Sequence, residues 1–317
     1  MEKVRRIMTV AEMKDREAWL KVRNTGIGGS DAGTIVGLNP WKSAYQLWLE
    51  KTGQTEPEDI SDREAVHFGN VLEEVVANEF AARTGKKVQR HGMLQSIEHP
   101  FLLANVDRMV VGEEAGLECK TASAYKTKAW EEDGLPDSYY VQCQHYMLVT
   151  GLPRWYIAAL IGGNHFVSKC IERNEEDIKA LFAAEADFWQ HVRKNTPPPV
   201  DGSSSCSQAL SERFLGGRSE VLTLDSKRLD AVMRLRELEQ AKADIEMQIG
   251  EQRNILKEFM GDYETAVYGT EENGGRITWK MQKGRTTIDA KRLKMEQPDI
   301  YAEYSKQGSP VRVFRMA

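Results

Sequence analysis

The stretch ANVDRMVVGEEAGLECKTA, residues 104–122, decides the fold and the chemistry expected of this chain. Apolar residues on both sides of its acidic, glycine-containing centre predict two strands joined by a hairpin turn. Asp107 ends the first strand, and Glu118 and Lys120 lie in the second as Glu-Cys-Lys. Because side chains two apart on a strand point to the same face, Glu118 and Lys120 share one face, and the hairpin can bring Asp107 beside Glu118.

These residues have the chemistry of a metal site. Two carboxylates and the backbone carbonyl of Cys119 offer oxygen ligands, which suit Mg²⁺, with Mn²⁺ as a substitute, better than zinc. Such an ion polarises a phosphodiester and lowers the pKa of a bound water, and Lys120 could orient or deprotonate that water. The pattern Glu-x-Lys also occurs at Glu12 and Lys14, in a helical segment. A surface ion pair on a hairpin is therefore the alternative for the motif taken alone.

Helices before and after the hairpin add two polar candidates. Residues 70–84 are predicted to form a helix with Glu73 at the rim of its apolar face, from which its carboxylate could reach the metal. A solvated helical carboxylate is the alternative for Glu73. Residues 137–150 predict a second helix with Gln142 near its start, where an inward amide can hold the attacking water.

The remaining pattern predicts an α/β or α+β body, because a strand trio is flanked by helices. Further strands are expected at 154–161 and 164–171, and a helix at 175–194. Between two N-terminal helices, TGIGGSDAGTIVGLNPW is a glycine-rich turn region.

A proline-rich stretch divides the chain. NTPPPVDGSSSCSQ cannot continue a helix or join a central strand, so residues 196–208 are predicted to be a linker. The core is then 1–195, and 209–317 is an extension with a long helix at 226–260 and a small strand region. We expect that helix to pack on the core or to form an oligomer contact.

Composition excludes several classes of protein. The chain has 317 residues, 41% hydrophobic and 29% charged, and a net charge of −5, which argues against a surface that is basic throughout. A local basic channel remains compatible with that charge. The four cysteines form no CxxC pair, which disfavours a disulfide framework, a zinc ribbon and an iron–sulfur cluster. No apolar run approaches the roughly 20 residues of a membrane helix, so we expect no membrane partner.

Five segments in order resemble the lambda exonuclease and YqaJ viral recombinase family, within the PD-(D/E)xK nuclease superfamily. The likeness runs from about Trp19 to about Glu172. The segments are RNTGIGGSDAGTIVG with NPW, FGNVLEEVVANEF, ANVDRMV, LECKTA and YYVQCQHYMLVTG. The resemblance implies a restriction-endonuclease-like core with a mixed central sheet flanked by helices. One departure is that Val106 stands where the motif has its leading proline.

The resemblance also implies roles for the residues of the metal site. Asp107 and Glu118 match the metal carboxylates, and Lys120 matches the motif lysine. Glu73 matches the helical carboxylate that completes the site, with Glu74 as the neighbour that could take its place.

Two further roles follow from the same likeness. Gln142 matches the helical glutamine, with Gln144 as the alternative in register. Arg23 and Ser30 match the pocket that this family uses to hold the 5′-phosphate of the strand being digested. An arginine offers a forked charge to phosphate, and a glycine-rich turn leaves backbone N–H groups free to bind an anion.

The activity implied is that of a Mg²⁺-dependent exonuclease that degrades linear double-stranded DNA from 5′ to 3′ and leaves a 3′ single strand for annealing. The resemblance implies a homo-oligomeric ring, trimer before tetramer, whose channel Lys42, Lys126 and Lys128 could line. It also implies a single-strand annealing protein as partner, and a phage or prophage origin in a bacterial cytoplasm.

Two other functions stay open from the sequence. One is a PD-(D/E)xK endonuclease or resolvase, which would cut closed circular DNA. The other is a catalytically silent scaffold that binds DNA ends during recombination without cutting them. Intact Asp107, Glu118 and Lys120 argue against the scaffold, because a decayed site usually loses one of its chemical groups.

Overall fold

The computed structural model describes residues 3–131, 134–270, 273–308 and 312–316. The chain divides into two compact units, Met1–Leu215 and Gly216–Ala317. The first unit holds every residue to which the sequence assigned a role in binding or chemistry.

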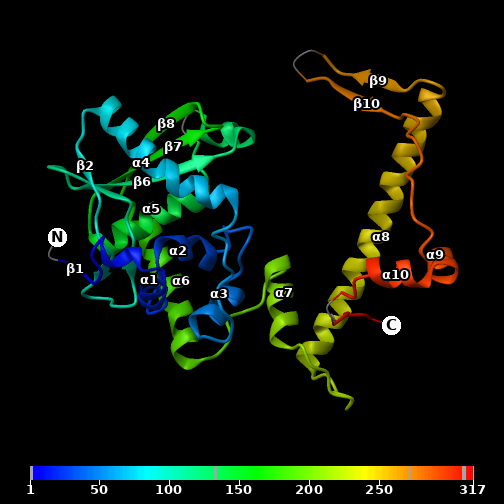
Figure 1. Cartoon of the computed structure of the whole chain (residues 1–317), viewed down its shortest axis with the longest axis horizontal. Coiled ribbons are helices and arrows are strands. Elements are labelled where there is room, and N and C mark those ends of the chain that lie inside the picture. Colours follow the sequence, from blue (N-terminus) through cyan, green and yellow to red (C-terminus); the bar gives the residue numbers. More distant parts are fainter. Residues whose placement is uncertain (1–2, 132–133, 271–272, 309–311, 317) are drawn as a thin grey trace. The chain divides into compact units, whose positions relative to one another are not determined.

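A five-stranded mixed sheet forms the centre of the first unit (Figure 1). Strand β6 pairs in parallel with β7, and the other neighbours in the sheet are antiparallel. In spatial order the strands are β2 (Val88–Gln89), β5 (Arg108–Val110), β6 (Ala115–Ala122), β7 (Arg154–Ile161) and β8 (His165–Glu172). The predicted mixed sheet is therefore confirmed.

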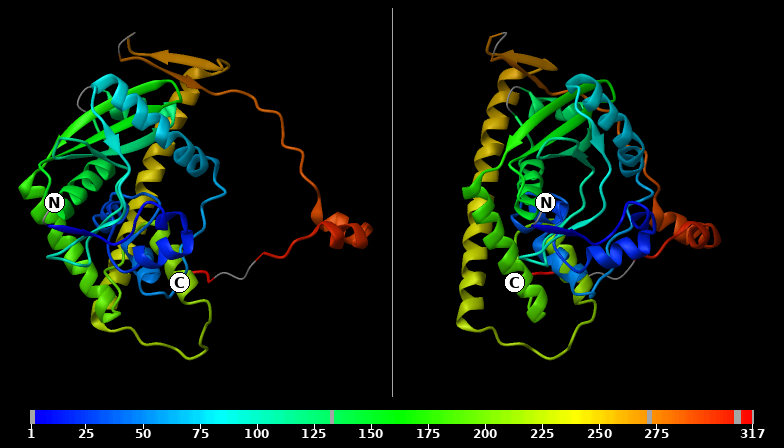
Figure 2. Two further views of the ribbon diagram at one scale, coloured as in Figure 1. Left: turned by 60° about the vertical axis from the view of Figure 1, so that its left-hand side comes forward. Right: turned by 90° about the vertical axis from the view of Figure 1, so that its left-hand side faces the viewer.

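Two helices cover opposite faces of this sheet (Figure 2). Helix α4 (Glu64–Thr84) buries Val76 and Phe80 against Leu117 of β6. On the other face, helix α5 (Asp137–Thr150) buries Met147 with Trp155 of β7. The layers are those of the predicted α/β core.

The alternation of side chains along β6 then determines which residues face which helix. Leu117 and Cys119 pack with the cluster around α4. Glu118 and Lys120 therefore face α5, the helix that carries Gln142. Gly116 makes room on that strand, because a Cβ there would lie 2.1 Å from the ring of Trp155.

A smaller sheet adjoins the first, and it changes one sequence-based expectation. Its strands are β1 (Val4–Arg6), β3 (Leu94–Ser96) and β4 (Leu103–Ala104). The one strand predicted before the hairpin turn is thus two strands, β4 in the small sheet and β5 in the central one. Residues 105–107 cross between the sheets, so Asp107 precedes β5 rather than ending a strand.

The N-terminal segment contributes four short helical elements. They are η1 (Glu12–Lys14), α1 (Arg16–Arg23), α2 (Gly29–Ile35) and α3 (Ala44–Lys51). The glycine-rich stretch expected to be a turn region includes the buried helix α2. A Cβ on Gly29 would lie 2.6 Å from the ring of Tyr146, so glycine is what lets α2 approach α5 this closely.

The irregular segment around the prolines is shorter than the linker predicted from the sequence. Helix α6 (Glu175–Lys194) precedes it, and helix α7 (Ser204–Arg213) already begins inside the predicted linker. The one helical element between β6 and α5 in the described residues is η2 (Ala124–Trp130). Cys206 and Ala209 of α7 are buried in the main core. The compact body consequently extends to Leu215 instead of ending at residue 195.

The second unit contains the long helix and a small hairpin. Helix α8 (Ser226–Met260) has the bounds that its apolar pattern predicted, and Asp225 caps its start by accepting a hydrogen bond from the backbone N–H of Arg228. The other elements are β9 (Thr265–Tyr268), β10 (Gly275–Thr278), α9 (Ala290–Glu296) and α10 (Pro298–Tyr304).

Candidate active site

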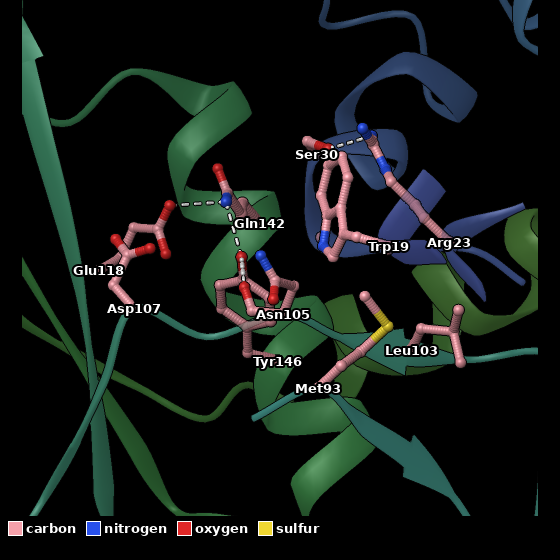
Figure 3. Close-up of a pocket in the computed structure, with 12 residues that line it drawn as sticks. Trp19, Arg23, Ser30, Met93, Leu103, Asn105, Asp107, Glu118, Gln142 and Tyr146 are labelled. Carbon is pink, nitrogen blue, oxygen red and sulfur yellow. Dashed lines mark hydrogen bonds between the residues drawn. The ribbon is translucent and has the colours of Figure 1, made fainter. Parts of the chain in front are cut away.

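Three predicted residues form a closed set of hydrogen bonds between β6 and α5. Lys120 Nζ donates to Glu118 Oε1 at 2.6 Å and to Gln142 Oε1 at 3.1 Å. Gln142 Nε2 donates to the same Glu118 oxygen at 2.7 Å (Figure 3). Each side chain therefore fixes the orientation of the other two.

Asp107 joins this set through the hairpin. The register that pairs Arg108 with Leu117 puts Asp107 next to Glu118, and the backbone N–H of Cys119 donates to Asp107 Oδ2 at 2.7 Å. Burial, and then the charge of Glu118, raise the pKa of Asp107 well above its usual range. A buried carboxylate and a half-buried one thus lie close together, an arrangement that a bound cation would relieve.

The charge on Lys120 follows from the same neighbours. Burial alone lowers the pKa of this lysine, but Glu118 and Asp107 outweigh burial and raise it. The ammonium is charged and lies 4.9 Å from the ring centre of Tyr139. It can orient a water or offset the charge of a phosphate.

Two residues of this network were not foreseen from the sequence. Gln142 Nε2 also donates to the hydroxyl of Tyr146 at 2.8 Å, and that hydroxyl donates to the backbone carbonyl of Asn105 at 3.1 Å. Tyr146 follows Gln142 by one helical turn, so both lie on one face of α5. That spacing is the signal which could have identified Tyr146.

The two candidate glutamines, Gln142 and Gln144, have different hydrogen-bond partners in the structure. Gln144 Nε2 donates to the backbone carbonyl of Glu172 at 2.9 Å, and its Oε1 accepts from the backbone N–H of Asn174. Both ends of that amide are used away from the carboxylates. Gln142 is thus the glutamine that contacts Glu118.

The two helical carboxylates, in contrast, face arginines. Arg108, whose side chain is only 4% exposed, pairs with both Glu73 and Glu74, and Arg90 also pairs with Glu74 at 2.9 Å. Glu73 nevertheless lines one further hollow together with Asp107, and its charge contributes to raising the pKa of Asp107. Glu73 as a metal ligand stays a prediction.

The donor set of the hairpin fits a hard divalent cation. Glu118 Oε2 is buried and accepts no hydrogen bond from any described residue. Together with Asp107 and the Cys119 carbonyl it offers the oxygen ligands that Mg²⁺ or Mn²⁺ prefers. Within the described ranges, no three His, Cys, Asp or Glu side chains already converge as a metal-binding cluster. The residues that fit are therefore two carboxylates and one backbone carbonyl.

The predicted phosphate-binding residues lie across a cavity from this set. Arg23 ends α1, and its Nη2 donates to Ser30 Oγ of α2 at 2.8 Å. Both residues line a cavity of about 190 Å³ that Asp107, Glu118 and Gln142 also line (Figure 3). The structure thus brings the two predicted groups to one cavity, although they are far apart in the sequence.

Apolar side chains complete the wall of this cavity. Trp19, Met93 and Leu103 line it together with Asn105, whose Oδ1 is buried with no hydrogen-bond partner among the described residues. The sequence did not identify any of these four as site residues, because they come from separate elements with no common spacing.

The three lysines predicted to contact DNA differ in their surroundings. Lys42 pairs with Glu50 at 2.7 Å. Lys126 and Lys128 line a second hollow with the fully exposed Tyr125 and with Tyr139, the residue beside Lys120. Lys126 and Lys128 therefore share a hollow with the tyrosine whose ring lies beside Lys120.

Comparison with known proteins identifies relatives of this chain. The family model of the YqaJ-like viral recombinase domain matches residues 18–153. The chain is 42% identical over 298 residues to the "Uncharacterized protein YqaJ" of Bacillus subtilis (strain 168), which covers 92% of this chain and 91% of that protein.

Solved structures show the same fold. The alkaline exonuclease LHK-Exo from Laribacter hongkongensis superposes with a TM-score of 0.50 at 18% identity, covering 56% of this chain and 93% of that chain. Its complex with dAMP gives the same TM-score at 20% identity. Among the described residues, no helix combines the length and apolar character that crossing a membrane requires.

Proposed function

The chain belongs to the family of YqaJ-like viral recombinases, and from this premise we propose that it is a Mg²⁺-dependent exonuclease. It degrades linear double-stranded DNA from 5′ to 3′ and leaves a 3′ single strand for recombination by annealing. The observation that supports this most directly is the shared cavity. An arginine and a serine suited to phosphate lie on one side of it, and the carboxylates lie on the other.

The two kinds of group in one cavity favour an exonuclease over an endonuclease. A strand with its terminal phosphate at Arg23 and Ser30 would bring a phosphodiester near that end to Asp107 and Glu118, which line the same cavity. Hydrolysis there removes one nucleotide from the end. A structure of LHK-Exo, which has this fold, contains dAMP, the kind of mononucleotide that such a cut releases.

The reaction needs water to add to the scissile phosphorus while the bond to the 3′ oxygen breaks and that oxygen takes up a proton. Asp107, Glu118 and the Cys119 carbonyl would hold the divalent ion. The ion supplies positive charge that polarises the phosphodiester and acidifies water. Gln142 orients the attacking water by its amide, and Lys120 donates hydrogen bonds to water or phosphate oxygens.

The product of one cut is the substrate of the next. Breaking the bond to the 3′ oxygen leaves a new 5′-phosphate on the shortened strand. That phosphate can enter the pocket of Arg23 and Ser30 after the strand advances. The same pocket therefore serves every cycle.

A ring around the DNA reconciles this function with the net charge of −5. We expect a trimer, or else a tetramer, with Lys42, Lys126 and Lys128 toward the central channel. Size-exclusion chromatography with light scattering tests the ring, and a protein that stays monomeric at micromolar concentration would exclude it. The expected partner is a single-strand annealing protein of the same phage or prophage.

Two alternatives are separated by substrate choice. An endonuclease or resolvase of the superfamily would cut closed circular DNA, which an end-dependent exonuclease leaves intact. A silent end-binding scaffold would bind linear DNA without cutting it in Mg²⁺. The test is therefore digestion of linear and circular DNA side by side, with a chelator control.

A further inference from the structure

Behind the phosphate pocket lies a buried carboxylate to which the sequence assigned no role. Asp31, in the first turn of α2, accepts a hydrogen bond from Arg23 Nη2 through Oδ1 at 2.9 Å. Its Oδ2 accepts from Lys51 Nζ at 2.8 Å and from the backbone N–H of Gly28 at 3.1 Å. Burial raises the pKa of Asp31, but Lys51 and Arg23 outweigh burial and hold it below its usual range. Asp31 is therefore a charged group that joins two residues lining this cavity, Arg23 and Gly28, to the buried Lys51.

Lys51 does not itself face a ligand. Its side chain is 2% exposed, and Nζ contacts three acceptors, which are Asp31 Oδ2, the Gly26 carbonyl at 2.6 Å and the Arg23 carbonyl at 3.0 Å. An ammonium has three hydrogens, so all are used. Lys51 ties the backbone of the α1–α2 connection to the carboxylate that holds Arg23.

Arg23, in contrast, keeps part of its guanidinium for a ligand. Its bonds to Ser30 and Asp31 both use Nη2, and within the described part of the chain none uses Nη1 or Nε. Its Cζ lies 5.4 Å from the ring centre of Trp19. A guanidinium held at one nitrogen by a fixed carboxylate presents the others in a defined direction.

We propose that Asp31 is a positioning residue, which holds Arg23 in the orientation that binds the terminal 5′-phosphate of the DNA strand. This inference rests on the proposed function, since it assigns the phosphate to Arg23 and Ser30. The negative charge of Asp31 also opposes the binding of an anion. Arg23 and Lys51 share this one carboxylate, so removing Asp31 makes the pocket more positive.

Because of this change in charge, the positioning role and a purely electrostatic role predict opposite effects on phosphate binding. If the pocket bound phosphate only by its net charge, loss of Asp31 would tighten phosphate binding. If Asp31 positions Arg23, the same loss weakens phosphate binding, although the local charge has become more favourable. The structural alternative, in which Asp31 only caps α2 through Gly28, predicts reduced stability and unchanged discrimination between ends.

The experiment compares binding of two DNA ends without cleavage. Fluorescence anisotropy in a chelator gives Kd for a short duplex with a 5′-phosphate and for the same duplex with a 5′-hydroxyl. For Asp31→Asn we expect the preference for the phosphorylated end to fall by about tenfold, the low end for loss of a residue that orients a ligand-binding group. Asp59→Asn is the matched control, because Asp59 pairs with Arg16 at 2.7 Å on the exposed surface.

Two further variants separate position from charge and from folding. Asp31→Glu keeps the charge and moves the carboxylate by one methylene. A positioning role predicts a reduced preference for the phosphorylated end, whereas a purely electrostatic role predicts an unchanged preference. The double change of Asp31→Asn with Lys51→Met restores the net charge of the wild-type pocket. Positioning predicts that its preference stays low, whereas charge predicts recovery. Circular dichroism checks that each variant is folded. If Asp31→Asn does not fold, the result for Asp31→Glu decides between the two roles.

The outcomes distinguish this inference from the proposed function. An unchanged or increased preference in folded Asp31→Asn and Asp31→Glu overturns the positioning role alone. A wild-type protein with no preference for the phosphate overturns the pocket and the positioning role together. An Asp31-dependent preference in a protein that never cuts DNA supports the positioning role and excludes the exonuclease.

Discussion

Replacing Tyr146 with phenylalanine removes one buried oxygen from the centre of the candidate site. That oxygen accepts a hydrogen bond from Gln142 at 2.8 Å and donates one to the Asn105 carbonyl at 3.1 Å. Burial, and then the charge of Glu118, raise the pKa of Tyr146, so the hydroxyl keeps the proton that it donates. The change keeps the ring, which packs against Gly29. It therefore tests the hydrogen bonds and leaves the packing in place.

The magnitude follows from the two lost bonds. A buried hydrogen bond contributes about 1 kcal/mol, so we expect Tyr146→Phe to lower the free energy of unfolding by about 1–2 kcal/mol. In a unit of this size that corresponds to a fall in melting temperature of about 2–8 °C. In the variant, Gln142 keeps its hydrogen bonds to Glu118 and Lys120 but loses the one to the Tyr146 hydroxyl, which helps to fix its amide. We expect kcat to fall about tenfold, which is about 1.4 kcal/mol.

The assay is steady-state release of mononucleotide from a 5′-phosphorylated linear duplex in Mg²⁺. KM for DNA and the preference for a 5′-phosphate should stay as in wild type, because the hydrogen bonds of the Tyr146 hydroxyl go to Gln142 and Asn105 rather than to Arg23 or Ser30. Tyr140→Phe is the matched control, since it deletes a hydroxyl on the same helix that donates to Asp177 at 2.6 Å. A kcat within about twofold of wild type, or an equal loss in Tyr140→Phe, would refute the role given to Tyr146.

Three other variants test separate parts of the account. Lys120→Ala should lower turnover by at least about 100-fold while the variant still binds DNA in a chelator, and normal turnover would remove Lys120 from the mechanism. Asp107→Ala should abolish the heat of Mn²⁺ binding in calorimetry, and a wild-type titration curve would exclude Asp107 as a ligand. Gly29→Ala should cost about 1–3 kcal/mol of stability, because its Cβ would lie 2.6 Å from the Tyr146 ring. Gly202→Ala, where nothing lies within 4 Å, should not change the melting temperature.

Local sequence patterns predicted how Asp107, Glu118, Lys120 and Gln142 come together in the candidate site. Glu118 and Lys120 share a face of β6 because a strand alternates its side chains, and Gln142 faces them because α5 follows in the chain and covers that face. The position of Asp107 follows from hairpin pairing, although it precedes β5 rather than ending a strand. These relations depend on neighbours in sequence, which is why the pattern sufficed.

Contacts between distant segments could not be predicted in this way. Arg108 pairs with Glu73 across the gap between β5 and α4, and nothing in either segment alone indicates it. The same holds for Lys51, whose bond to Asp31 depends on how α3 packs beside α2. Likewise, prolines correctly mark where α6 ends, but burial of Cys206 and Ala209 decides that the chain after them rejoins the body.

Digestion of linear duplex DNA labelled at one 5′ end tests the central claim most directly. The DNA carries either a 5′-phosphate or a 5′-hydroxyl, and closed circles and a chelator serve as controls. The account predicts release of labelled mononucleotide in Mg²⁺, faster from the phosphorylated end, with circles intact and no release in the chelator. Cutting of the circles, or binding of linear DNA without any release of nucleotide, would contradict it.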